Sequence, residues 1–125
     1  MIKPVNNIHA VLFGLSEDLA TELCCRLKAC IVRIEAIHGR PGSDIQTVMN
    51  TRADIIFCGP DPNLVGELRT AKPCAAIVVV SRDAEVNPWL DAIEAGATDY
   101  CAAPFETAQV RWIVESSMRA TAAAA

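Results

Sequence analysis

The chain contains no apolar stretch long enough to cross a membrane. A bilayer-spanning helix needs roughly 20 apolar residues, whereas the longest apolar run in these 125 residues, 74–80, has the length of a β-strand. The apolar segment 8–15 is interrupted by His9 and followed by acidic residues, unlike the core of a secretory signal peptide. We therefore expect a cytoplasmic protein that makes no membrane contact.

The chain also lacks an excess of basic residues. Lys and Arg total 11 and Asp and Glu total 15, which gives a net charge of -4 at neutral pH. Proteins that bind duplex nucleic acid neutralise phosphates with a basic face. We therefore expect no direct contact with nucleic acid.

The six cysteines follow no metal-binding or disulfide pattern. The chain has no Cys-x-x-Cys pair, and His9 and His38 do not lie at zinc-ligand spacing from any pair of cysteines. An even number of cysteines indicates a disulfide framework mainly in small secreted chains. We expect six reduced cysteines that act as small buried hydrophobic residues. The alternative, a redox-sensing thiol, depends mostly on Cys58.

The length and composition are those of one globular domain. With 125 residues, of which 52% are apolar, the chain can bury one hydrophobic core but is too short for two. We expect a single domain over residues 1–120. Residues 121–125 are expected to form an Ala-rich tail or the beginning of a linker.

Strand-like and helix-like segments alternate along the chain. The expected strands are 8–15, 30–37, 53–58, 75–80 and 98–101. The expected helices lie within 16–28, 43–49, 64–68, 86–93 and 110–118. Such alternation predicts an α/β fold in which helices cover both faces of a parallel sheet. In sheets of this kind the functional crevice lies beyond the carboxyl ends of the strands.

One continuous motif resembles a known family. Residues 91–105 read Asp-Ala-Ile-Glu-Ala-Gly-Ala-Thr-Asp-Tyr-Cys-Ala-Ala-Pro-Phe. This resembles the end of a receiver domain of two-component response regulators, where a helix closes on Gly-Ala, a Tyr lies in the fifth strand and Lys-Pro-Phe follows. Asp54 resembles the beginning of the receiver's third strand, and Ser81 falls where the family has Ser or Thr. The resemblance implies the flavodoxin-like three-layer fold with strand order 2-1-3-4-5.

The residues that carry receiver chemistry differ in this chain. A receiver accepts a phosphoryl group on an aspartate at the end of its third strand, and the resemblance places Gly59 there. The acidic pair that holds a divalent cation after the first strand corresponds to Gly14 and Leu15. The lysine before Pro-Phe corresponds to Ala103. The chain thus resembles a degenerate receiver, a pseudo-receiver that lacks the phosphoacceptor, and we expect no metal and no cofactor.

Two receiver positions are retained, and three acidic residues could in principle replace the lost ones. Ser81 and Tyr100 match positions that take part in switching in the family. Asp61 could be a displaced acceptor, but its Pro-flanked setting favours a turn former. Glu17 and Asp18 could hold a cation, although their place at the start of a helix already explains them.

We expect a regulatory binding module and not an enzyme. The expected interaction face consists of the fourth helix, the fifth strand and the last helix, with Trp89, Tyr100 and Ile113 at its surface, because Trp and Tyr are enriched at binding hot spots. The partner is another protein, a second copy, or an effector domain in a longer chain. The resemblance extends to non-phosphorylated receivers in antitermination-type and other transcription regulators and in pilus-assembly localisation ATPases.

An alternative is a small-ligand-binding or redox-sensing flavodoxin-like domain. The segment 14–17, Gly-Leu-Ser-Glu, is not a Gly-rich phosphate loop. Acidic residues at the start of the following helix repel phosphate. The sequence therefore favours the interaction module over the ligand-binding domain.

Overall fold

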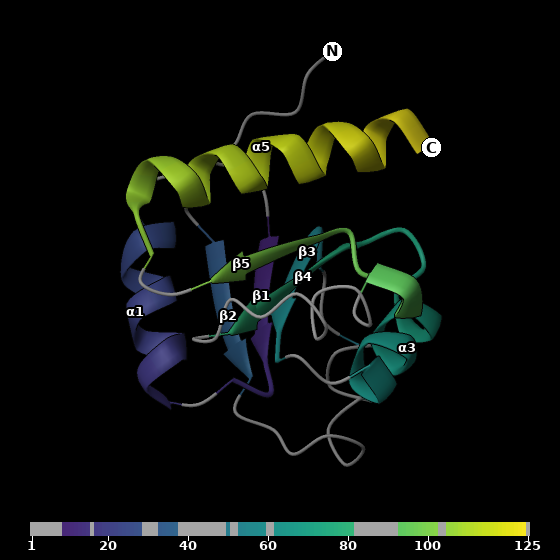
Figure 1. Ribbon diagram of the computed structural model, residues 1–125, viewed down its shortest axis with the longest axis horizontal. Coiled ribbons are helices and arrows are strands. Elements are labelled where there is room, and N and C mark those ends of the chain that lie inside the picture. Colours follow the sequence, from purple (N-terminus) through teal and green to yellow (C-terminus); the bar gives the residue numbers. More distant parts are fainter. Residues whose placement is uncertain are drawn as a thin grey trace.

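The computed structural model describes residues 9–15, 17–28, 33–37, 50, 53–59, 62–81, 93–102 and 105–124 (Figure 1). For 33–37, 62, 102 and 118–124 only the backbone is described. The strands are β1 (His9–Phe13), β2 (Arg33–Ile37), β3 (Ile55–Cys58), β4 (Ala76–Ser81) and β5 (Asp99–Ala102). The helices are α1 (Glu17–Leu27), α3 (Pro62–Ala71) and α5 (Thr107–Ala124).

The five strands form one parallel sheet in the order β2-β1-β3-β4-β5. All six residues of β4 are buried, and β4 lies between β3 and β5. A strand covered on both faces reads as a continuous apolar run, and residues 75–80 have that pattern. The order 2-1-3-4-5 confirms the flavodoxin-like topology.

Two hydrophobic clusters lie on opposite faces of the sheet. Successive strand residues point to opposite faces, so Leu12 packs in the cluster of α1 and α5, whereas Phe13 packs in the cluster of α3. Figure 1 shows α1 and α3 on opposite sides of the sheet, with α5 running across the top of the view. Phe105, which is 2% exposed, fixes the chain to the α1–α5 cluster just before α5 begins. The fold is therefore a three-layer sandwich.

The helices differ from the expectation in extent. Of the expected fourth helix, the structure describes only the helical turn 93–95 before Gly96, and the expected second helix, 43–49, lies outside the described residues. Helix α5 continues to Ala124 through most of the segment expected to be a tail. The run of alanines explains this continuation, because alanine has the highest helix propensity. No helix in the described part of the chain is both long and apolar enough to span a bilayer.

At the amino-terminal edge of the sheet, Arg69 of α3 joins the beginnings of β4 and β5. Its guanidinium group donates hydrogen bonds to the carbonyl oxygens of Pro73, Ala75 and Gly96 at N···O distances of 2.7–3.1 Å, and to Thr98 Oγ1 at 3.3 Å. Gly96 has φ +119°, and a Cβ there would lie 3.4 Å from Cγ of Arg69. Glycine thus permits the turn, because a φ of +119° is one that residues with a Cβ rarely adopt.

Candidate functional site

The candidate site lies at the carboxyl edge of the sheet, where β1, β3 and β4 end. Phe13 pairs with Cys58, and Cys58 pairs with Val79, two residues before the end of β4. Because the strands are parallel, the residues that follow β1 and β3 meet at this edge. The structure therefore brings Gly14 and Gly59 together at this edge.

Gly59 follows β3 directly and is buried. A Cβ at this position would lie 3.4 Å from the carbonyl oxygen of Gly14, which is ordinary van der Waals contact. Its φ is not in the left-handed region, so the backbone could carry a side chain without strain. Position 59 accordingly has room for a Cβ, but glycine places no side chain there.

Gly14 differs from Gly59 because its backbone favours glycine. Its φ is +69°, and a Cβ there would lie 3.2 Å from Cδ2 of Leu64, a buried residue of α3. This left-handed turn also ends β1 at Phe13, two residues before the expected end of the strand. The neighbouring Leu15 is half-buried and packs against the α1–α5 cluster. Neither position presents a side-chain oxygen that could hold a cation.

Ser81 and Tyr100, the two receiver positions that the sequence retains, are both at least partly buried. Ser81 is the last residue of β4 and is 8% exposed. Tyr100 of β5 is half-buried and packs against the cluster beneath α3. Three further residues predicted for the site or the face, Asp61, Ala103 and Trp89, lie outside the described residues.

Asp54 is far from this edge and does not contribute to the site. It precedes β3, and its Oδ2 accepts a hydrogen bond from the backbone N–H of His9 at 2.9 Å. Its own backbone N–H donates to the carbonyl oxygen of His9 at 2.8 Å. Asp54 thus fastens the beginnings of β1 and β3 together. Within the described residues, no group of three His, Cys, Asp or Glu side chains could hold a metal ion.

The expectation that Ile113 lies at the surface is wrong. Ile113 is 3% exposed, and it belongs to the buried stripe of α5, which is Val110, Ile113, Val114 and Ser117. These positions have the spacing of one helix face, so Ile113 lies within that face and not beside it. The exposed aromatic residue of α5 is instead Trp112, at 60%. Helical spacing could have found it, because each step along a helix rotates the side chain by about 100°.

The cysteines are less uniformly buried than the sequence suggested. Cys58 and Cys101 are buried, whereas Cys25 and Cys74 are exposed and Cys24 is half-buried. Burial, assisted by the negative charge of Asp99, raises the pKa of Cys101 to about 11. No disulfide joins these five cysteines. A buried thiol with a raised pKa is a poor nucleophile, which describes Cys101. Cys58 is also buried, so its sulfur is shielded from oxidants in solution.

No protein-family model matches the chain, and no curated protein matches it in sequence. Solved structures do match it. The signal receiver domain of an HD domain-containing protein from Pseudomonas fluorescens has a TM-score of 0.81 at 12% identity, over 98% of this chain and 95% of that one. A two-component response regulator from Clostridium difficile has a TM-score of 0.77 at 18% identity, over 90% and 97%.

An orphan response regulator of H. pylori is also similar, with a TM-score of 0.74 at 18% identity over 93% of this chain and 100% of that one. Sequence identities this low carry no information on activity. The three likenesses show that the chain has the fold of receiver domains.

Proposed function

We propose that this chain is a receiver-fold signalling module that takes up no phosphoryl group and regulates through a permanently displayed protein-binding surface. The observation that carries the proposal is Gly59 at the end of β3. Phosphoryl transfer to a receiver needs a carboxylate at this position, and glycine supplies none. The module is therefore not an enzyme.

The surroundings of Gly59 support the same proposal. A divalent cation is held in proteins by several oxygen ligands, usually carboxylates. Gly14 and Leu15 offer no side-chain oxygen, and the turn at Gly14 favours glycine because of its left-handed φ of +69°. Ala103 offers no ammonium group to the phosphoryl oxygens. The nucleophile, the cation ligands and the counter-charge are thus missing together.

A module without phosphorylation has no chemical input to shift its conformation. Its balance of conformations is then set by its sequence, and a partner can shift that balance only by binding one conformation better. We therefore propose regulation by protein contact. The output, through transcription, antitermination or localisation of a pilus-assembly protein, belongs to an effector domain or to a separate partner.

The test is exposure to phosphodonors. Incubation with acetyl phosphate and Mg²⁺ is expected to leave the intact mass unchanged, and beryllofluoride with Mg²⁺ is expected to leave the Trp fluorescence unchanged. A conventional receiver in the same reaction shows that the reagents are active. Stoichiometric phosphorylation mapped to any aspartate, Asp61 included, would contradict the proposal.

A Gly59→Asp variant serves as the second arm of this test. The backbone at position 59 and the space around a Cβ there accept a side chain, but the new carboxylate gains no cation ligand from the side chains of Gly14 or Leu15. We expect no phosphorylation of this variant either. Robust phosphorylation would mean that Glu17 or Asp18 holds the cation.

A further inference from the structure

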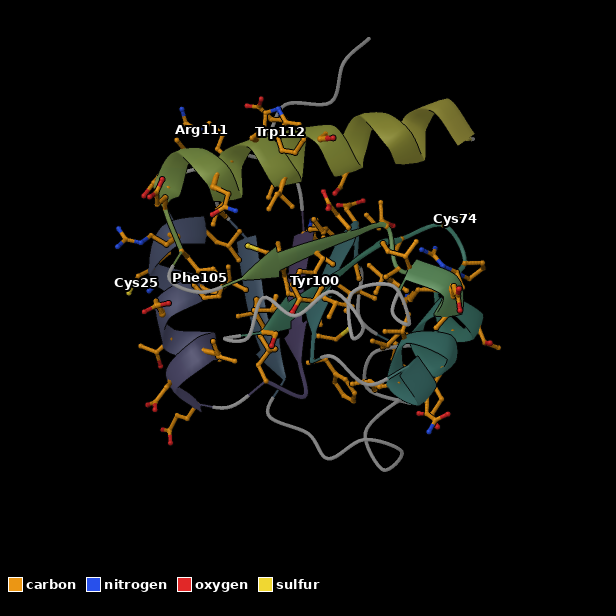
Figure 2. All side chains as sticks on the ribbon, viewed as in Figure 1. Cys25, Cys74, Tyr100, Phe105, Arg111 and Trp112 are labelled. Atoms are coloured by element: carbon orange, nitrogen blue, oxygen red, sulfur yellow. The ribbon has the colours of Figure 1, made fainter. Side chains whose placement is uncertain are left out.

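Helix α5 presents one large aromatic side chain away from the core. Trp112 is 60% exposed and lies on the far side of the helix from Val110, Ile113 and Val114. Figure 2 shows its ring on the outer surface of α5, beside Arg111. In the described residues the other exposed large hydrophobic side chain is Ile93, at 39%.

Charged side chains of opposite sign flank Trp112. Arg111 is exposed and Glu115 is half-buried. A line along α5 that points directly away from the core divides its outer surface in two. At about 100° per residue, Trp112 lies on one side of this line, and Arg111 and Glu115 lie on the other side, one turn apart. The outer surface of α5 therefore has an aromatic side and a side that carries both charges.

This arrangement is complementary to itself. Consider a two-fold axis that lies between two copies of α5, perpendicular to the helix, at the level of Ile113. This axis makes the two helices antiparallel. It also places the aromatic side of one helix next to the aromatic side of the other, and the charged side next to the charged side. In that register Trp112 meets Trp112 of the partner subunit. Arg111 meets Glu115 of the partner subunit, and the two-fold repeats this contact. Such a reciprocal pairing is what an isologous dimer interface requires.

We propose that a second copy of this chain binds here, through an antiparallel α5–α5 contact centred on Trp112. The inference rests on the proposed function, since it identifies the partner for the permanently displayed surface. A partner whose contact surface carries charges of a single sign would place a like charge opposite either Arg111 or Glu115, and like charges weaken association. The second copy places an opposite charge next to each of these residues and covers the tryptophan.

The first experiment measures self-association by sedimentation equilibrium over a range of protein concentrations. The wild type is expected to dimerise, and Trp112→Ala is expected to raise the dissociation constant about tenfold or more, as for an interface hot spot. Ile93→Ala is the matched control, because it removes the other exposed hydrophobic side chain, and it should leave the constant unchanged. Circular dichroism melts verify that each variant is folded.

The second experiment exchanges the charges. Arg111→Glu alone and Glu115→Arg alone should each weaken the homodimer, because each places like charges opposite one another. An equimolar mixture of the two variants should form a heterodimer, in which opposite charges face each other again at both contacts. Any ion pair within one helix is lost in both variants, so only a contact between chains can restore association.

Three outcomes would overturn the dimer: a wild type that is monomeric at every concentration, a dimer that Trp112→Ala leaves intact, or a mixture that associates no better than its components. None of these outcomes bears on phosphorylation. Conversely, phosphorylation of the wild type would overturn the proposed function without changing the sedimentation result. The two proposals can thus fail separately.

Discussion

At the scale of single residues, Gly14 and Gly59 sit side by side for different physical reasons. The turn at Gly14 requires a positive φ, which L-residues with a Cβ adopt at a cost of roughly 1–2 kcal/mol. The backbone at Gly59 makes no such demand. The sequence located both glycines at the carboxyl edge of the sheet. It could not distinguish them, because both are glycine and the residue type alone does not say which of the two adopts a positive φ.

This difference predicts unequal effects on stability. Gly14→Ala should lower the free energy of unfolding by about 1–2 kcal/mol, through backbone strain and the contact with Leu64. Gly59→Ala, the matched control, should leave that free energy unchanged or raise it by up to about 1 kcal/mol, because alanine reduces the entropy of the unfolded chain. Urea denaturation measures both. Equal losses would show that the turn does not constrain Gly14.

At the scale of elements, the sequence predicted the sheet better than the surface of the helices. The unbroken apolar run of β4 predicted an interior strand, and the strand lies between two others. For α5 the apolar spacing located the helix and its buried stripe. The assignment of Ile113 to the surface failed because that residue belongs to the stripe itself, while Trp112 faces outward.

The junction around Arg69 also belongs to this scale, because it connects α3 to two strands. Arg69→Ala should lower the free energy of unfolding by about 1–3 kcal/mol, since it removes the donors that satisfy the part-buried carbonyl oxygens of Gly96 and Ala75. Arg69→Lys should recover only part of this loss, because an ammonium group cannot reproduce the planar arrangement of five donors.

Thr70→Ala provides the control on the same helix. The Thr70 hydroxyl donates only to the carbonyl oxygen of Gly66, at an exposed position. Its removal should change the free energy of unfolding by no more than about 0.5 kcal/mol. If Arg69→Ala is no more destabilising than Thr70→Ala in urea denaturation, the junction contributes nothing to stability.

At the scale of the whole molecule, the fold separates four of the described thiols into an exposed pair and a buried pair. At pH 8, iodoacetamide should modify Cys25 and Cys74 in the folded protein, and Cys58 and Cys101 only after unfolding. Peptide mapping after labelling with and without urea identifies the sites. Modification of Cys58 in the folded state as fast as Cys25 would favour the redox-sensing alternative.

Cys101 also gives stability a dependence on pH. Its pKa rises from 9.0 to about 11 on folding, because burial disfavours the thiolate. The neutral thiol therefore stabilises the fold fully below pH 9, and this contribution is lost as the pH rises toward 11. The sequence could locate Cys101 in a strand but could not supply this shift, which depends on the packing around the sulfur.

The amino-terminal edge of the sheet has two junctions of different composition. At the junction of β1 and β3, Asp54 Oδ2 accepts a hydrogen bond from the His9 N–H, and the Asp54 backbone N–H donates to the His9 carbonyl oxygen. At the junction of β4 and β5, the side chain of Arg69 donates to the carbonyl oxygens of Ala75 and Gly96 and to the Thr98 hydroxyl. Substitution of Asp54 therefore leaves the backbone half of the first junction in place, whereas substitution of Arg69 removes every hydrogen bond that this side chain makes at the second.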